Sequence, residues 1–191
     1  MRKIKLQNSI LDALDMDSLM PVIGTYHDYF TLLSGQEHYR LLRYLGQQIE
    51  GDIVEIGTHA GTSAIALAAD NNYTVLTYDI VDEKVKDHSD QLNIIFRLTD
   101  YSTDNEYQDT ILSSKMIFID APHNGGFERE CYSWLKEKCY KGLTVWDDIH
   151  LNAEMRSFWA DVDLPKQDIT KYGHVTGTGV IYFSKDIELL T

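Results

Sequence analysis

From residue 52 to residue 147 the chain repeats one pattern, in which short apolar runs alternate with polar or small-residue segments. The five apolar runs end at Gly57, Asp79, Asp100, Asp120 and Asp147. Strands that alternate with helices form a mainly parallel sheet with helices on both faces. Parallel strands place their carboxyl ends at one edge of the sheet, where ligands bind. The pattern therefore predicts an α/β fold with a glycine and four carboxylates along one edge. Four carboxylates at one edge repel each other unless a cation or hydrogen-bond donors meet them.

The two ends of the chain depart from this pattern. Residues 1–33 are predicted to be a helical appendage, and residues 34–191 a single domain. Tyr26, Tyr29 and Phe30 would either cover a substrate as a lid or pack against helices, and packing is the favoured alternative. The last two apolar runs, in 166–173 and 177–184, have no helix between them and are expected to form an antiparallel hairpin.

Composition limits the partners and the compartment. The chain carries 17 Lys plus Arg against 30 Asp plus Glu, a net charge of −13, which disfavours a nucleic-acid partner. No segment is apolar enough for a signal peptide or a membrane span, so no membrane association is expected. Cys131 and Cys139 are too far apart on a predicted helix to pair, which favours a reducing, cytoplasmic setting.

The segment "EIGTHAGTSA" joins the first strand to a small-residue helix. Gly57 allows close backbone approach, and the helix that starts near Thr62 offers free N–H groups to a carboxylate. Asp79, at the end of the second strand, could accept both hydroxyls of a ribose. The alternatives are a plain tight turn for the glycines and a helix N-cap for Asp79.

Together these residues resemble the class I S-adenosylmethionine-dependent methyltransferases, and particularly the small O-methyltransferases related to catechol and macrolide-sugar O-methyltransferases. The resemblance covers about residues 34–184 and implies a Rossmann-like, mostly parallel seven-stranded sheet with an antiparallel strand near the C-terminus. It implies S-adenosylmethionine as cofactor and assigns the following residues to its binding: Glu55, Gly57, Thr58, Gly61, Thr62, Ser63, Asp79 and Asp100. The G-x-G-x-x-G pattern of dinucleotide-binding proteins is absent, which disfavours an NAD-dependent oxidoreductase.

The resemblance also implies a Mg²⁺ site formed by Asp120, Asp147 and Asp148. Three carboxylates from neighbouring strand ends suit a hard divalent cation that keeps positions for water and a substrate oxygen. Asp148 stands where catechol-type enzymes have asparagine, which adds negative charge. In the alternative interpretation, Asp147 is a structural acid and Asp148 a solvated turn residue.

Several histidines compete for the role of general base beside Asp120. His123 occupies the offset at which catechol-type enzymes carry a lysine. His150 follows the acidic pair and is a rival base or a residue that orients a carboxylate. His174, in the turn between the last two strands, is a rival base that could face the substrate, although the glycines alone would explain that turn. His59, in the glycine loop, would contact either cofactor or solvent.

The sequence thus predicts methyl transfer from S-adenosylmethionine to a hydroxyl of a small molecule, assisted by a divalent metal. Two other hypotheses stay open: a metal-independent N- or O-methyltransferase, and a non-catalytic module that binds a nucleoside or a protein partner. The sequence does not fix the oligomeric state, and a homo-oligomer is compatible with it.

Overall fold

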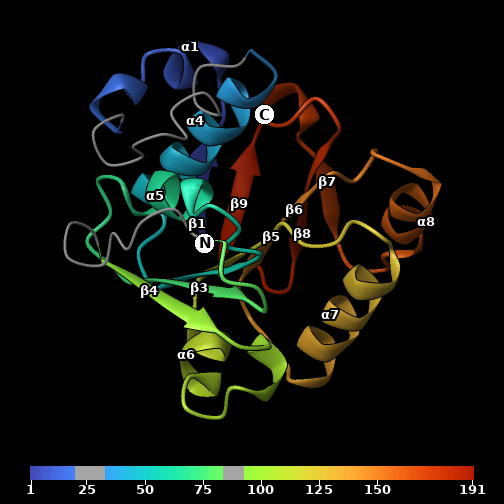
Figure 1. The fold of residues 1–191 in the computed structure, drawn as a ribbon. Coiled ribbons are helices and arrows are strands. Elements are labelled where there is room, and N and C mark those ends of the chain that lie inside the picture. Colours follow the sequence, from blue (N-terminus) through green and yellow to red (C-terminus); the bar gives the residue numbers. More distant parts are fainter. Residues whose placement is uncertain (20–32, 84–92) are drawn as a thin grey trace.

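A computed structural model of the chain describes residues 1–19, 33–83 and 93–191. Its centre is a seven-stranded sheet with the strand order β4-β3-β2-β5-β6-β8-β7 (Figure 1). In chain order the strands are β2 (Ile53–Ile56), β3 (Val75–Asp79), β4 (Ile94–Leu98), β5 (Met116–Ile119), β6 (Leu143–Asp147), β7 (Lys166–Asp168) and β8 (Thr178–Tyr182). The predicted mostly parallel α/β sheet is confirmed.

Helices cover both faces of this sheet because the strand residues alternate between two hydrophobic clusters. Ile53 and the residues of the other strands that face the same side of the sheet pack with α4 (Leu33–Gln48) and α5 (Thr62–Ala68). Val54 and the strand residues that face the opposite side of the sheet pack with α6 (Gln108–Ser113), α7 (Gly126–Glu137) and α8 (Ala153–Asp161). Strand side chains point alternately to opposite faces, so consecutive apolar residues produce strands that are buried on both sides.

The end of the chain forms the predicted antiparallel hairpin. β8 runs antiparallel to both β6 and β7, and Asp147 is opposite Thr178 in the β6–β8 register. A short 3₁₀ helix, η4 (Thr170–Tyr172), lies between β7 and β8. This pairing brings the turn at residues 173–177 to the end of β6.

The N-terminal segment differs from the expected helical appendage. β1 (Arg2–Lys5) pairs in parallel with β9 (Ile187–Leu190), forming a separate two-stranded sheet. After it come α1 (Asn8–Leu11), of only four residues, and the 3₁₀ helix η1 (Met16–Leu19). The aromatic residues proposed as a lid, Tyr26, Tyr29 and Phe30, lie outside the described residues. Among the described residues, no helix has the length and apolar character of a membrane span.

Candidate functional site

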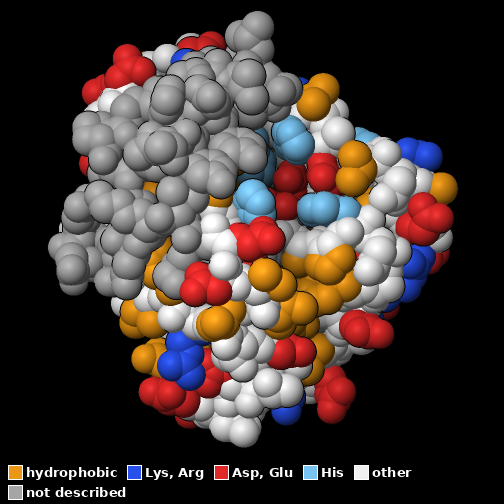
Figure 2. Space-filling view, in the orientation of Figure 1, with side chains coloured by type: hydrophobic (Ala, Val, Ile, Leu, Met, Phe, Trp, Pro, Cys, Tyr) orange, Lys and Arg blue, Asp and Glu red, His pale blue; other side chains and the backbone are white. Residues whose placement is uncertain are grey.

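A cleft of about 340 Å³ opens at the carboxyl ends of the central strands. It is lined by Ile56, Gly57, His59, Tyr78, Asp79, Ile80, Thr99, Asp100, Tyr101, Asp120, Ala121, Pro122 and Phe127. Figure 2 shows red carboxylates and pale blue histidines gathered around a hollow on the same face of the molecule. Gly57, Asp79, Asp100 and Asp120, predicted to share one edge, therefore line one cavity.

The glycine loop is shaped by backbone conformations that other residues rarely adopt. Gly57 has φ 106°, and a Cβ at this position would lie only 1.8 Å from the backbone oxygen of Asp120. Gly61 has φ 83° and is the N-cap of α5. Because Gly57 carries no side chain, the β2 loop can approach the end of β5, and the glycine side of the cleft adjoins its acidic side.

Glu55 anchors the loop from beneath. Its carboxylate is fully buried and accepts a hydrogen bond from Thr77, whose hydroxyl also lies 2.6 Å from that of Thr58. Burial raises the pKa of Glu55 to about 8, although the nearby hydroxyls of Ser63 and Thr77 oppose the shift. Glu55 Oε1 has no hydrogen-bond partner among the described residues.

Asp79 and Asp100 both stabilise local backbone as well as lining the cleft. Asp79 accepts hydrogen bonds from the N–H groups of His59 (2.9 Å) and Val81 (3.0 Å). Asp100 caps the 3₁₀ helix η3 (Tyr101–Thr103) by accepting from the N–H of Ser102 at 2.8 Å. The sequence suggested a capping role for Asp79 and not for Asp100, where the structure has it. Both carboxylates lie in the wall of the cleft.

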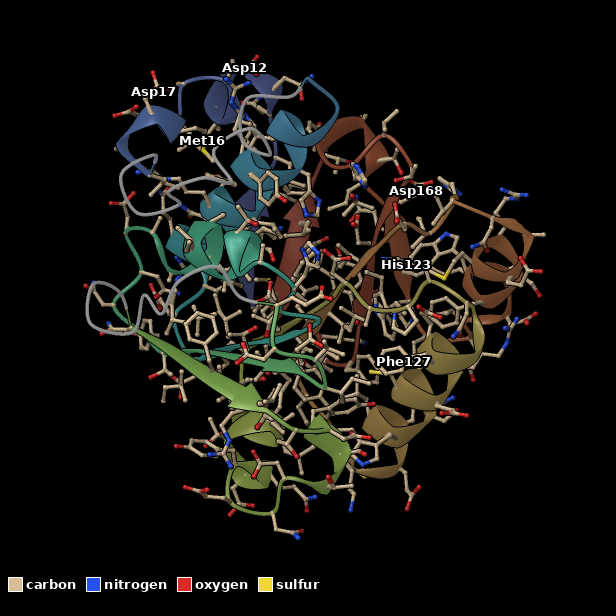
Figure 3. The ribbon with its side chains drawn as sticks, in the orientation of Figure 1. Asp12, Met16, Asp17, His123, Phe127 and Asp168 are labelled. Carbon is tan, nitrogen blue, oxygen red and sulfur yellow. The ribbon has the colours of Figure 1, made fainter. Side chains whose placement is uncertain are left out.

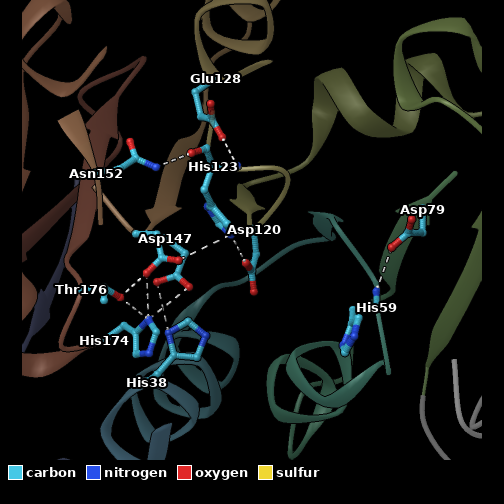
Figure 4. Close-up of polar contacts among 11 residues, drawn as sticks. His38, His59, Asp79, Asp120, His123, Glu128, Asp147, Asn152, His174 and Thr176 are labelled. Carbon is cyan, nitrogen blue, oxygen red and sulfur yellow. Dashed lines mark hydrogen bonds and ion pairs between the residues drawn. The ribbon is translucent and has the colours of Figure 1, made fainter. Parts of the chain in front are cut away.

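The acids after β5 and β6 lie side by side with histidines (Figure 4). His123 Nε2 is 3.1 Å from Asp120 Oδ1 and 3.6 Å from Asp148 Oδ2. His174 Nδ1 is 3.1 Å from Asp148 Oδ1 and 3.5 Å from Asp147 Oδ2. Thr176 donates a hydrogen bond to Asp148 and lies 2.8 Å from His174 Nδ1. The two predicted bases His123 and His174 therefore both contact the predicted metal-binding acids.

Local structure explains why these side chains point inward. Asp148 and His123 have positive φ values, 58° and 53°, which turn the chain sharply after each strand. His123 is then held by its own backbone: its N–H donates to Glu128 at 3.0 Å and its carbonyl accepts from Asn152 at 2.8 Å. In Figure 3, His123 precedes α7, and Phe127 lies in the first turn of that helix.

A further histidine, His38, reaches the acids from α4. Its side chain is only 6% exposed, and its Nδ1 lies 3.6 Å from Asp147 Oδ1. The motifs of the sequence give it no role in the site. A signal was nevertheless available, because His38 shares a helical face with Leu41, Leu42 and Leu45, all of which are fully buried. A histidine in such an apolar row needs a polar partner.

His150 and His59 lie apart from this cluster. His150 Nε2 contacts Asp168 Oδ2 at 2.8 Å and is 39% exposed, and its backbone carbonyl accepts from Arg156. His59 is exposed and faces Glu83 at 3.5 Å. Of the three candidate bases, His150 is the one whose ring contacts a carboxylate outside the acidic cluster, that of Asp168.

The buried charges set the protonation of the cluster. Burial raises the pKa of Asp147, whereas hydrogen bonds from His174 and Thr176 overcome burial and lower that of Asp148. Contacts with Asp147 and Asp148 raise the pKa of His174 to about 10. Burial alone would lower the pKa of His123, but the hydrogen bond and charge of Asp120 outweigh it and raise the value. His174 is thus a cation at neutral pH that offsets the acidic pair.

Comparison with known proteins identifies the fold. No family model and no curated protein matches the sequence. Among solved structures, the O-methyltransferase TomG from Streptomyces achromogenes, in complex with S-adenosylmethionine, has a TM-score of 0.62 and 18% identity, covering 90% of this chain and 92% of its own. The O-methyltransferase from Bacillus cereus, in complex with S-adenosylhomocysteine, has a TM-score of 0.59 and 18% identity, covering 92% and 96%. The chain therefore has the fold of these methyltransferases, as the resemblance in sequence implies.

Proposed function

We propose that this protein transfers a methyl group from S-adenosylmethionine to a hydroxyl of a small molecule, with the help of a divalent cation. One observation carries the proposal. A cleft with a glycine loop and two strand-end carboxylates, Asp79 and Asp100, leads directly to a second acidic cluster around Asp120. The first group suits a nucleoside cofactor and the second suits a reacting oxygen. The structures of similar fold bound to S-adenosylmethionine or S-adenosylhomocysteine support the choice of cofactor.

The cofactor would lie along the cleft from Asp100 to Gly57. Asp79 would accept the ribose hydroxyls, and the N–H groups of Thr62 and Ser63 at the start of α5 would face the methionine end, with Glu55 supporting the glycine loop from below. The negative wall of the cleft suits a sulfonium cation. These residues would hold the methyl group toward Asp120, which lines the same cleft.

The acidic cluster fits a divalent cation. Asp147 Oδ1 and His38 Nδ1 are buried atoms with no hydrogen-bond partner among the described residues. Potential ligand atoms, one from each of His38, Asp147 and Asp120, lie within 4.8 Å of one another. Asp120, Asp147 and Asp148 would hold the ion. When bound, it would lower the pKa of a substrate hydroxyl and orient that oxygen.

His123 is the proposed general base. Its ring is partly exposed at the cluster, and Asp120 holds Nε2 in place. His174 is less suited to this role, because its Nδ1 contacts both Asp147 and Asp148 and lies 2.8 Å from the Thr176 hydroxyl. The chain's own residues thus would align an oxygen with the methyl group, exclude water and accept a proton.

Calorimetric titration of S-adenosylmethionine into the metal-free protein, repeated with a divalent cation present, tests the proposal. We expect micromolar binding that Asp79→Asn weakens by at least about 10-fold, since each 1.4 kcal/mol of lost interaction is a factor of ten. Asp109→Asn, an equal charge change at an exposed position of α6 outside the cleft, should leave the affinity unchanged.

The outcomes separate the three hypotheses. Methylation of hydroxylated acceptors that stops when divalent ions are chelated supports the full proposal. Turnover that survives chelation leaves a metal-independent methyltransferase. An absence of S-adenosylmethionine binding in either state contradicts the proposal and leaves a binding module of the same fold.

A further inference from the structure

We infer that His38 is a direct ligand of the divalent cation, and that the site therefore selects a borderline transition ion such as Zn²⁺ over Mg²⁺. This inference rests on the metal of the proposed function. It concerns a ligand from α4, far in sequence from the acids that follow β5 and β6.

The first support is the state of two buried atoms. His38 and Asp147 are each 5% exposed, and His38 Nδ1 and Asp147 Oδ1 both lack a hydrogen-bond partner among the described residues. Buried polar atoms in folded proteins are almost always satisfied by protein, water or an ion. Two unsatisfied atoms that face each other indicate that something binds both.

The second support is their spacing. His38 Nδ1 and Asp147 Oδ1 are 3.6 Å apart, too far for a hydrogen bond to each other. Two ligands of a tetrahedral ion at ~2.1 Å are separated by ~3.4 Å, close to this value. Asp120 supplies a third oxygen, because donor atoms, one from each of His38, Asp147 and Asp120, lie within 4.8 Å of one another, and Asp120 is partly exposed in the wall of the cleft.

The second possible metal-binding cluster already has hydrogen bonds among its own residues. Asp147, Asp148 and His174 also lie close enough to hold an ion. His174 Nδ1, however, lies 3.1 Å from Asp148, and Thr176 donates to that same carboxylate. These atoms have hydrogen-bond partners without a metal, whereas His38 Nδ1 has none among the described residues. We therefore place the ion between His38, Asp147 and Asp120. His38 thus replaces Asp148 in the ligand set given under the proposed function, and Asp148 lies beside the ion with His174.

The ligand type decides the ion. Mg²⁺ prefers oxygen ligands in near-octahedral geometry and retains several waters. Imidazole nitrogen together with carboxylate suits Zn²⁺, Co²⁺ and Mn²⁺, and affinities at such sites rise from Mn²⁺ through Co²⁺. A set of one histidine and two aspartates, largely buried, leaves little room for a hydrated Mg²⁺.

Metal binding to the chelator-stripped full chain tests this inference without any measurement of activity. Zn²⁺ affinity is measured by competition with a chromophoric chelator, Mg²⁺ affinity by calorimetry, and the coordination of Co²⁺ by its visible absorption. We expect Zn²⁺ to bind at least about 100-fold more tightly than Mg²⁺. His38→Ala should weaken Zn²⁺ binding by more than the ~10- to 100-fold typical of losing an outer partner, and should change the Co²⁺ spectrum.

His150→Ala is the matched control, because it removes an imidazole near the cluster that contacts Asp168 instead. Its Zn²⁺ affinity and Co²⁺ spectrum should equal those of the wild type. Unchanged Zn²⁺ affinity and an unchanged spectrum in His38→Ala would overturn the inference, as would equal affinities of the wild type for Zn²⁺ and Mg²⁺.

Crystals of the wild-type protein soaked in Zn²⁺ give a second test if His38→Ala does not fold. An anomalous peak at ~2.1 Å from His38 Nδ1 supports the assignment. A peak bonded to Asp147 and Asp148 with His38 outside its coordination sphere refutes it. S-adenosylmethionine binding is measured separately, so Zn²⁺ bound through His38 without cofactor binding would leave this inference standing while the proposed function fails.

Discussion

At the scale of single residues, the buried carboxyl of Glu55 makes stability depend on pH. Its pKa is raised to about 8 in the folded protein, while in the unfolded chain it titrates near 4.5. Between these values the unfolded state ionises and the folded state does not, so rising pH lowers the free energy of unfolding. Below pH 4.5 both states are protonated and the contribution is constant. The loss across the window is on the order of a few kcal/mol.

Glu55→Gln should remove this dependence, because an amide of the same shape does not titrate. Urea denaturation of both proteins from pH 5 to pH 8 measures the effect. The wild-type free energy of unfolding should fall more steeply than that of the variant. His174, whose pKa is also raised, contributes to both curves and cancels in their difference. Parallel curves would show that Glu55 ionises freely in the fold.

At the scale of elements, Asn152 links α8 to His123. Its side-chain oxygen accepts from the N–H of Met155 at 2.8 Å and caps the helix, while its amide nitrogen donates to the His123 carbonyl at 2.8 Å. Asn152→Ala should lose both bonds and cost ~1–2 kcal/mol of stability. Asn152→Asp keeps the capping oxygen but cannot donate.

The two variants separate the roles of this residue. We expect Asn152→Asp to retain most of the stability while shifting the NMR signals of the His123 ring. Asn152→Ala should both lose stability and shift those signals. Equal stability losses in the two variants would mean that the bond to His123, rather than the cap, holds α8 in place. Urea denaturation and a proton–nitrogen spectrum of the histidine rings provide the measurements.

The elements also show what local pattern can predict. The apolar runs and their terminal acids predicted the strand ends correctly, because burial on both faces demands consecutive apolar residues. The cap at Asn152 is equally local, since its side chain accepts from Met155, three residues further along the chain. The place of His38 in the site could not be predicted from local pattern. Asp147, which it faces, lies more than a hundred residues away in the chain and comes near only when α4 packs on the sheet.

At the scale of the whole molecule, the pairing of β1 with β9 joins the two ends of the described chain. The segment "RKIK" is too short and too charged to predict a strand, so only the folded structure reveals it. Ile4 is 2% exposed and packs with Leu189 in the cluster that includes α4 and the central sheet. The N-terminal strand is thus part of the core that supports the site.

Ile4→Ala should therefore destabilise the entire domain, by ~2–5 kcal/mol for a buried isoleucine. Lys3→Ala changes the adjacent residue on the opposite face, where the side chain is 57% exposed and 3.9 Å from Glu188, and a surface pair of this kind contributes only ~0–1 kcal/mol. Both variants should unfold in a single transition when followed by circular dichroism and by tryptophan fluorescence, since the small sheet shares its core with the large one. Equal stabilities of the two variants, or an early transition confined to one probe in Ile4→Ala, would instead mean that β1 and β9 unfold apart from the sheet that carries the acids.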